Sequence, residues 1–432
     1  MRKMVGLLLC AVVVAGHGTG ALAQGSSAAA TFNPVVEWNK TLLVIVRTTG
    51  AQPATVHPTR SFAIMHAAIY DAVNAIDRSH ESYLVELGRV PATASRDAAA
   101  SVAAHDVLSA LYPAFQATLD AQLSQELAAL PADANTTQGE DLGHAVAAAI
   151  VDLRRDDGSA AQPIPFLFVN APGRYQSTPP NFPPQPQFTH WSHVTPFVLA
   201  GAGQFRPGPP PALTSNTYAD SFNQVKALGI ANSTAATPDQ ALIGRFWNGA
   251  IQNYWNEIAQ TAALRHSLTT TDSARLFALL NLSLADSVIA FYDAKYTYDF
   301  WRPVTAIRAA DPRTNSQTQP DPNWLPEAGN TANDPSYPGA HAAISAAAQT
   351  VLVAFFQKDD FRLDVTSEVL PGIERHFASF SAAEREASLS RIFAGVHFSI
   401  DEQAGETLGG RVAHFVIEQS LYPEKHEERM AP

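Results

Sequence analysis

The sequence predicts an all-α protein, and three observations support this prediction. The chain has 432 residues, of which 46% are hydrophobic and 16% charged, so it contains enough apolar material for a large buried core. Apolar residues recur at helical spacing through most of the chain, whereas the alternation typical of half-buried strands never persists beyond a few residues. The same segments are rich in alanine and leucine, which favour helix.

The first 23 residues have the features of a secretory signal peptide. Arg2 and Lys3 precede an apolar run over residues 5–14, and a stretch of small residues follows it. Cleavage would remove Cys10, the only cysteine of the chain, and would leave no thiol or disulfide chemistry. We therefore expect residues 24–432 to be one helical domain that is secreted or periplasmic.

Ten later segments have helical periodicity. In the clearest of them, residues 62–76, apolar side chains recur every three or four positions on one face. Two capping boxes predict helix starts, one formed by Thr237 with Gln240 and the other by Ser381 with Glu384. The predicted helices are residues 62–76, 98–112, 114–130, 138–155, 217–228, 238–264, 272–301, 341–356, 382–398 and 401–421.

One long segment interrupts the helical pattern. Residues 163–211 contain 13 of the 30 prolines of the chain, together with several aromatic residues. A flexible linker would leave these aromatic side chains exposed to water, so we expect an ordered, irregular belt packed on the helices. Residues 272–421, which follow it, contain the motifs described below.

The charge balance limits the partners that the protein can bind. Lysine and arginine number 28 against 40 aspartates and glutamates, and the net charge of −12 disfavours nucleic acid and anionic membrane surfaces. After the signal peptide, no segment has eighteen apolar residues without polar interruption; the richest, residues 340–356, contains His341. We expect no nucleic acid and no membrane partner.

Three motifs contain side chains that could bind a ligand or act in catalysis, and the first pairs a lysine with an arginine. Lys295 and Arg302 are seven positions apart, which places them on one face of a helix if both are helical. Two cations on an apolar, aromatic face are unfavourable unless an anion lies between them. In the alternative interpretation, each side chain reaches solvent by extending along its aliphatic stem.

The second motif is a proline-glycine turn that leads into an alanine-rich helix. Such a turn directs the free amides of Gly339 and Ala340, and the positive end of the helix dipole, toward one point. His341 lies beside this predicted anion site. Turns of this kind are common, so this signal is weak by itself.

The third motif combines Arg391, His397 and Asp401. Asp401 follows His397 by four positions, so it can fix the tautomer of the imidazole and leave the other ring nitrogen free to attack or to bind a metal. A single histidine in an apolar helix is more often a hydrogen-bonded core residue. Here the histidine is not alone, because Arg391 precedes it by six positions and Asp401 follows it by four.

In this order, the motifs K-x6-R-P, P-G-A-H and S-R-x5-H-x3-D resemble the three-part signature of the vanadium-dependent haloperoxidases and the type 2 phosphatidic acid phosphatase superfamily. Residues 65–76, 204–213 and 295–308 are also similar to the secreted bacterial haloperoxidase-like branch. The resemblance therefore covers most of the chain. It implies two packed helix bundles, with a tetrahedral oxyanion bound where the motifs meet.

The resemblance also implies a role for each motif residue. Lys295, Arg302 and Arg391 would neutralise the oxygens of vanadate or phosphate. His397 would bind vanadium in a haloperoxidase or attack phosphorus in a phosphatase. His341 matches the acid–base histidine of the family.

The second motif departs from the family pattern, which reads P-S-G-H. Gly339 stands at the serine position and Ala340 at the glycine position. The backbone amides can remain, but one hydroxyl donor is lost, which costs about 1.5–3 kcal/mol of oxyanion binding if nothing replaces it. We expect Gly339→Ser to tighten vanadate binding by about tenfold.

The function that the resemblance implies first is a vanadium-dependent haloperoxidase. It would oxidise halide with hydrogen peroxide at a vanadate bound to His397, with a small organic substrate as halogen acceptor. One alternative is a soluble secreted acid phosphatase that binds phosphate and forms a phosphohistidine at the same residue. The other is a non-catalytic helical protein whose site has decayed, which only Gly339 supports.

Overall fold

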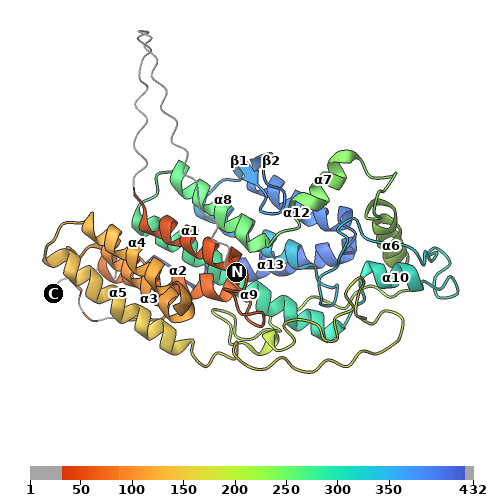
Figure 1. Ribbon diagram of the computed structural model, residues 1–432, viewed down its shortest axis with the longest axis horizontal. Coiled ribbons are helices and arrows are strands. Elements are labelled where there is room, and N and C mark those ends of the chain that lie inside the picture. Colours follow the sequence, from red (N-terminus) through yellow and green to blue (C-terminus); the bar gives the residue numbers. More distant parts are fainter. Residues whose placement is uncertain (1–31, 87, 89, 424–432) are drawn as a thin grey trace, which may run out of the picture. The chain divides into compact units, whose positions relative to one another are not determined.

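The computed structural model describes residues 32–423, apart from residues 87 and 89, and the predicted signal peptide lies outside them. The described residues from Asn33 to Pro423 belong to one compact unit. The described residues form thirteen α-helices and two short strands (Figure 1), which confirms the predicted all-α class. The helices are α1 Pro34–Arg47, α2 Thr59–Asp77, α3 Arg96–Leu111, α4 Gln116–Ala128, α5 Ala134–Leu153, α6 Asn216–Leu228, α7 Pro238–Phe246, α8 Ile251–Arg265, α9 Thr270–Tyr298, α10 Pro303–Ala309, α11 Ala340–Phe356, α12 Phe380–Phe393 and α13 Ser399–Gln419.

The helices pack as two groups on opposite parts of one long helix, α9. Helices α2, α3 and α5 contact one another, and α2 lies along α9. Helices α11, α12 and α13 form the second group, in which α11 and α13 also pack on α9. In Figure 1, α3, α4 and α5 lie together at one end, and α6 and α10 lie at the other.

Helix α9 is buried on nearly all sides because it lies between the two groups. The side chain of Thr269 caps it by accepting from the amide of Asp272, 3.1 Å away. Among the described helices it is the one long and apolar enough to span a membrane, and 94% of its most apolar window is buried in this fold. The segment predicted to be richest in apolar residues, 340–356, is the shorter α11.

The proline-rich belt is held to the core by a buried carboxylate of α9. Residues 163–211 contain one short 3-10 helix, Trp191–His193, and are otherwise irregular. Asp286 accepts the backbone amides of Phe197, Val198 and Leu199 at 2.6, 2.7 and 2.9 Å. One side chain therefore fixes three consecutive belt residues against α9.

Two predicted helix starts have different outcomes. The capping box of Thr237 and Gln240 is present at the start of α7, as predicted. The prediction for Ser381 is wrong, because Ser379 caps α12 by accepting from the amide of Ala382 at 3.1 Å. Ser381 instead donates its amide and hydroxyl to the carboxylate of Asp359.

Other boundaries also differ from the predictions. The predicted helix 238–264 is two helices, α7 and α8, because the chain leaves the helical conformation after Phe246 and resumes it at Ile251. Helices α1 and α10 and both strands were not predicted. The strand β1, Asp360–Thr366, has alternating burial, so a period-two signal was present but covered only seven residues.

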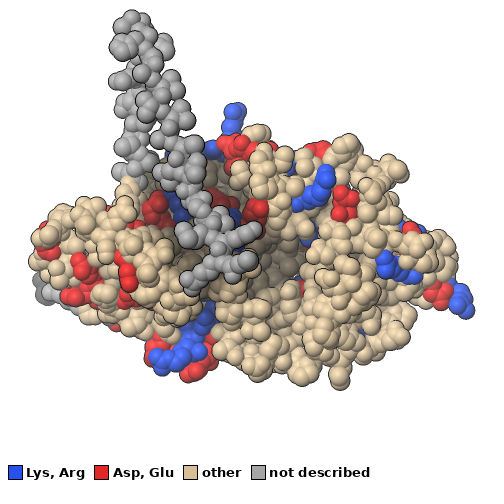
Figure 2. Space-filling view, in the orientation of Figure 1, with Lys and Arg blue, Asp and Glu red and all other residues tan. Residues whose placement is uncertain are grey.

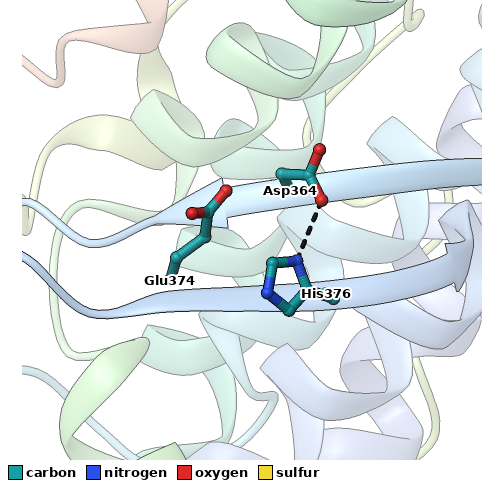
Figure 3. A group of neighbouring side chains, drawn as sticks. All are labelled: Asp364, Glu374 and His376. Atoms are coloured by element: carbon teal, nitrogen blue, oxygen red, sulfur yellow. Dashed lines mark hydrogen bonds and ion pairs between the residues drawn. The ribbon is translucent and has the colours of Figure 1, made fainter.

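The strands β1 and β2, Glu374–Ser379, form an antiparallel hairpin. Figure 3 shows Asp364, Glu374 and His376 on this hairpin, with their metal-binding atoms within 4.8 Å of one another. Asp364 and His376 are direct cross-strand partners, with Nδ1 and Oδ1 2.9 Å apart, and Arg265 pairs with the same aspartate at 2.7 Å. The register and ordinary charge pairing explain this exposed group.

The surface carries no large patch of one charge on the face in Figure 2. Lysine and arginine side chains lie interspersed there with aspartate and glutamate. A duplex or an anionic bilayer requires clustered positive charge, which this face lacks.

Candidate active site

The three motifs meet around one cavity of about 300 Å³, which we call the motif cavity. The predicted site residues that line it are Arg302, Ala340, His341, Arg391 and His397. The other three lie behind this lining, hydrogen-bonded to residues of the second and third motifs: Lys295, Gly339 and Asp401. The fold thus brings all eight predicted residues together.

The first motif is not one continuous helix. Helix α9 ends at Tyr298, and Asp299 follows it in the left-handed conformation with φ of 52°. Arg302 is the N-cap residue of α10, with extended backbone angles. The predicted helix 272–301 is therefore too long. Lys295 and Arg302 approach each other because a turn, rather than a shared helix face, joins them.

A carboxylate that the sequence analysis missed lies between these two cations. The Nζ atom of Lys295 is 3.6 Å from Oδ1 of Asp334 and donates to the carbonyls of Pro335 and Ser336. Arg302 donates from Nε to the carbonyl of Asp334 at 2.8 Å and from Nη2 to its carboxylate. Lys295 is 0% and Arg302 1% exposed, so Asp334 is their main counter-charge.

The pKa shifts in this group follow from burial and from the same pairing. Burial lowers the pKa of Lys295 to about 8, against the opposing attraction of Asp334. Burial alone would raise the pKa of Asp334, but Lys295 and Arg302 together hold it below its usual value. Both Lys295 and Asp334 are therefore charged at neutral pH.

His397 lies in the connection between α12 and α13, with its two nitrogens in different environments. Nε2 is 2.9 Å from Nη1 of Arg302, and Nδ1 is 3.1 Å from Oδ2 of Asp401. A guanidinium only donates, so Nε2 is the acceptor and Nδ1 carries the proton that Asp401 accepts. Burial and then Arg302 lower the pKa of His397 well below its usual value, so the ring is neutral.

Asp401 is fixed by three donors at the start of α13. Its Oδ2 accepts from the hydroxyl of Ser336 at 2.6 Å, the amide of Phe398 at 2.9 Å and the imidazole of His397. Burial raises the pKa of Asp401 to about 6, and the bonds from Ser336 and Phe398 oppose that rise. The carboxylate therefore holds the imidazole in one orientation.

The connection that contains His397 requires a glycine. Gly395 has φ of +78°, and a Cβ atom there would lie 2.2 Å from the carbonyl oxygen of Gly229. Only glycine fits both the conformation and the space. This reversal brings His397 back toward Arg391, although the predicted helix 382–398 included both residues.

The N-terminus of α11 offers fewer amides than the sequence suggested. The amide of Gly339 donates to the carbonyl of Asp401 at 2.8 Å, so it is already bonded. The first helical bond runs from the amide of Ala343 to the carbonyl of Gly339, which leaves the amide of Ala340 without a helical acceptor. The anion site at this turn therefore depends on Ala340 and the residues that follow.

The position of Gly339 is restricted by Glu402, another residue that the sequence analysis missed. A Cβ atom on Gly339 would lie 2.4 Å from Oε1 of Glu402. Glu402 is 3% exposed, and neither of its carboxyl oxygens has a hydrogen-bond partner. Burial, together with Asp401, raises the pKa of Glu402 well above its usual value. A serine at position 339 would overlap this side chain.

His341 occupies the first turn of α11. Its Nε2 is 3.0 Å from the carbonyl oxygen of Trp247 and must donate to it, so Nδ1 is the acceptor in the neutral ring. Burial and then the charge of Arg391 lower its pKa well below the usual value. The neutral imidazole lines the cavity as a proton acceptor.

Arg391 supplies unused hydrogen-bond donors. Nη2 donates to Oδ1 of Asn248 at 3.1 Å, whereas the buried Nε and Nη1 atoms have no hydrogen-bond partner among the described residues. Burial lowers the pKa of Arg391 to about 10, with Glu402 opposing the shift, and the side chain stays charged. A buried guanidinium with two free donors fits an oxyanion with two acceptor oxygens. The residues present therefore fit a tetrahedral oxyanion such as vanadate or phosphate.

The opposite wall of the cavity is aromatic and comes from distant parts of the chain. The ring centroids of His57 and Phe188 are 5.3 Å apart, and those of Phe188 and Tyr292 are 5.2 Å apart. Burial lowers the pKa of His57 to about 3, so this wall is uncharged. No motif marked His57 or Phe188, because both belong to segments far from the C-terminal motifs.

Comparison with known proteins identifies the class to which this site belongs. Residues 275–423 match the family model described as the VCPO second helical-bundle domain. The fold matches that of a solved bacterial vanadium-dependent haloperoxidase, an iodoperoxidase. In sequence and in fold the chain is similar to the vanadium-dependent haloperoxidases, which supports the superfamily that its motifs predicted.

Three relatives define the similarity further. The vanadium chloroperoxidase of Curvularia inaequalis is 26% identical over 351 residues, which cover 62% of this chain and 57% of that enzyme. The chain thus spans little more than half the length of this curated relative. The first bacterial vanadium-dependent iodoperoxidase superposes with a TM-score of 0.77 at 25% identity, over 90% of this chain and 96% of that one. An apo-type bacterial vanadium-dependent chloroperoxidase shares the fold, with a TM-score of 0.63 at 16% identity over 87% and 96% of the two chains.

Proposed function

We propose that this protein is a vanadium-dependent haloperoxidase, which oxidises a halide with hydrogen peroxide and delivers the halogen to a small organic substrate. One observation carries the proposal. The neutral His397 lines a cavity together with the buried cations Arg302 and Arg391, and its Nε2 accepts from Nη1 of Arg302, a hydrogen bond that a bound vanadate would replace. When bound, vanadate supplies a Lewis acid that activates peroxide without thiol or haem chemistry.

The chain's own residues would divide the work of binding. Nε2 of His397 would be the single protein ligand of vanadium, and Asp401 would hold the proton on Nδ1. The free Nε and Nη1 atoms of Arg391 would donate to oxyanion oxygens, with Arg302 beside them. Lys295 would contribute positive charge from behind the lining.

Proton transfer would fall to His341. Its neutral Nδ1 can accept a proton from incoming peroxide, and the resulting imidazolium can return that proton to the departing oxygen. The pKa of His341 lies well below its usual value, and a bound oxyanion would raise it by adding negative charge.

The deciding experiment compares three activities on one preparation. The apoprotein is first assayed for hydrolysis of p-nitrophenyl phosphate, then supplied with vanadate, peroxide and bromide or iodide and assayed for halogenation of a dye. We expect vanadate-dependent halogenation. Phosphate ester hydrolysis without halogenation would favour the acid phosphatase, and neither activity would favour the decayed protein.

We also propose that the protein is exported, through residues 1–23. N-terminal sequencing of the protein recovered from the periplasm or the medium should begin at Gln24. Recovery of the full-length chain from the cytoplasm alone would contradict this.

A further inference from the structure

The three cations of the site differ in how many of their donors are already bonded within the protein. The Lys295 ammonium pairs with Oδ1 of Asp334 and donates to the two following carbonyls, those of Pro335 and Ser336. Arg302 is held by both the carbonyl and the carboxylate of Asp334. Arg391, by contrast, keeps two buried donors without a partner.

We propose that Asp334 is a positioning residue that acts as a built-in counter-ion, holding Lys295 and Arg302 in place and setting the net charge that the site offers to an oxyanion. This inference rests on the proposed function, because it concerns the same oxyanion site. Asp334 offsets one of the three positive charges of Lys295, Arg302 and Arg391, so it lowers the attraction of the site for an oxyanion while it keeps Lys295 and Arg302 in place.

The alternative is that Asp334 forms an ordinary structural ion pair. Its place argues against this, because the residue is 3% exposed yet lines the motif cavity beside Arg302 and His397. A carboxylate at the wall of an anion site repels the ligand. It is useful there only if it keeps a neighbouring cation charged and oriented.

Lys295 is the cation that needs such support. The charged groups that act on it are Asp334 from the loop before α11, Arg302 at the start of α10, and Asp401 and Glu402 at the start of α13. Asp334 is the strongest of these influences and the one that most favours the ammonium form. Without it, burial and Arg302 would drive the pKa of Lys295 below about 8.

The substitution Asp334→Asn therefore has opposite effects at different pH. Near pH 6, Lys295 is protonated in both proteins, and the variant has one more net positive charge. We expect it to bind sulfate about tenfold more tightly than the wild type. Above pH 8, Lys295 loses its proton more readily in the variant, so the pH at which sulfate affinity falls should shift down by about one unit.

The test is isothermal titration of the apoprotein with sulfate between pH 5.5 and 9.5, since sulfate keeps its charge throughout. The matched control is Asp293→Asn on α9, the helix of Lys295, which removes the ion pair with Arg206 outside the motif cavity. This control should show the wild-type profile. If Asp334→Asn does not fold, Lys295→Met in the wild-type background should abolish the alkaline fall in affinity, and Asp334→Glu should retain it.

An unchanged pH profile in Asp334→Asn would overturn the inference, as would equal loss of sulfate binding at every pH, which a structural role predicts. If Asp334→Asn does not fold, the inference would be overturned by a fall in sulfate affinity at alkaline pH that persists in Lys295→Met. Sulfate binding needs neither vanadate nor peroxide. A shifted profile in a protein that does not halogenate would therefore support the role of Asp334 while refuting the proposed function. Halogenation by a protein whose pH profile is not shifted by Asp334→Asn would support the proposed function and refute the role of Asp334.

Discussion

The carboxyl group of Glu402 occupies the space that a side chain at position 339 would need. Oε1 of Glu402 would lie 2.4 Å, and Oε2 2.9 Å, from a Cβ atom built on Gly339. Glycine at the family's serine position is therefore matched to a glutamate that follows Asp401 on α13. The two residues form one unit of the site, and they explain why the departure from the P-S-G-H pattern leaves no void.

This relationship changes the expected outcome of restoring the serine. Gly339→Ser alone forces a side chain against a buried carboxyl group, so we expect a loss of about 1–3 kcal/mol in the free energy of unfolding and no gain in vanadate affinity. In the double variant Gly339→Ser with Glu402→Ala, the hydroxyl has room. It should bind vanadate about tenfold more tightly than Glu402→Ala alone. Tighter binding by the single serine variant would show that Glu402 moves without cost.

The two histidines should respond differently to removal. His397→Ala eliminates the one protein atom proposed to bind vanadium, so vanadate binding and bromination should both be lost. His341→Ala leaves Arg302, Arg391 and His397 in place, so binding should weaken modestly while turnover falls by about a hundredfold or more. Titration with vanadate and steady-state bromination measure these effects. Equal loss of binding in both variants would overturn the assignment.

The neutral state of His341 gives a pH-dependent stability difference. Its folded pKa lies well below 6.5, so below pH 6.5 the unfolded chain binds a proton that the folded chain does not. Acid therefore destabilises the wild type through this residue. Relative to the wild type, His341→Gln should gain about 1.4 kcal/mol in unfolding free energy per pH unit of acidification below pH 6.5. A constant difference between pH 7 and pH 5, measured by urea unfolding, would mean that folding does not lower the pKa of His341.

The belt should depend on a single carboxylate of α9. Asp286→Ala removes the acceptor of three buried or half-buried amides, those of Phe197, Val198 and Leu199. We expect a loss of more than about 3 kcal/mol in unfolding free energy and faster proteolysis within residues 163–211. Asp293→Ala, which removes a surface ion pair of the same helix, should cost less than about 1 kcal/mol. Similar losses in the two variants would refute the anchoring role.

The sequence predicted which motif residues come together, but it did not predict the backbone conformation that brings them together. Spacing suggested that Lys295 and Arg302 share a helix face, yet α9 ends at Tyr298 and a turn brings the two together. Helical periodicity reports burial along one element, so it contains no information about a turn that adds a residue to a site. The order and spacing of the motifs nevertheless predicted residues that the structure brings together around one cavity.

The residues that the sequence did not reveal are those whose role depends on tertiary contacts. Asp334 and Glu402 are single acidic residues without periodicity, and only the packed structure shows that each is buried against a cation or a glycine. His57 and Phe188 come from segments remote from the motifs. The class of fold, in contrast, followed from apolar periodicity that extends over most of the chain.

The central claim is that His397 holds a vanadate that makes this protein a haloperoxidase. The most direct test is the rate of dye bromination by purified protein with peroxide and bromide, measured with and without vanadate, for the wild type and His397→Ala. The account predicts turnover by the wild type only when vanadate is present, and none by His397→Ala under any condition. Vanadate that binds without bromination, or equal turnover by the two proteins, would contradict it.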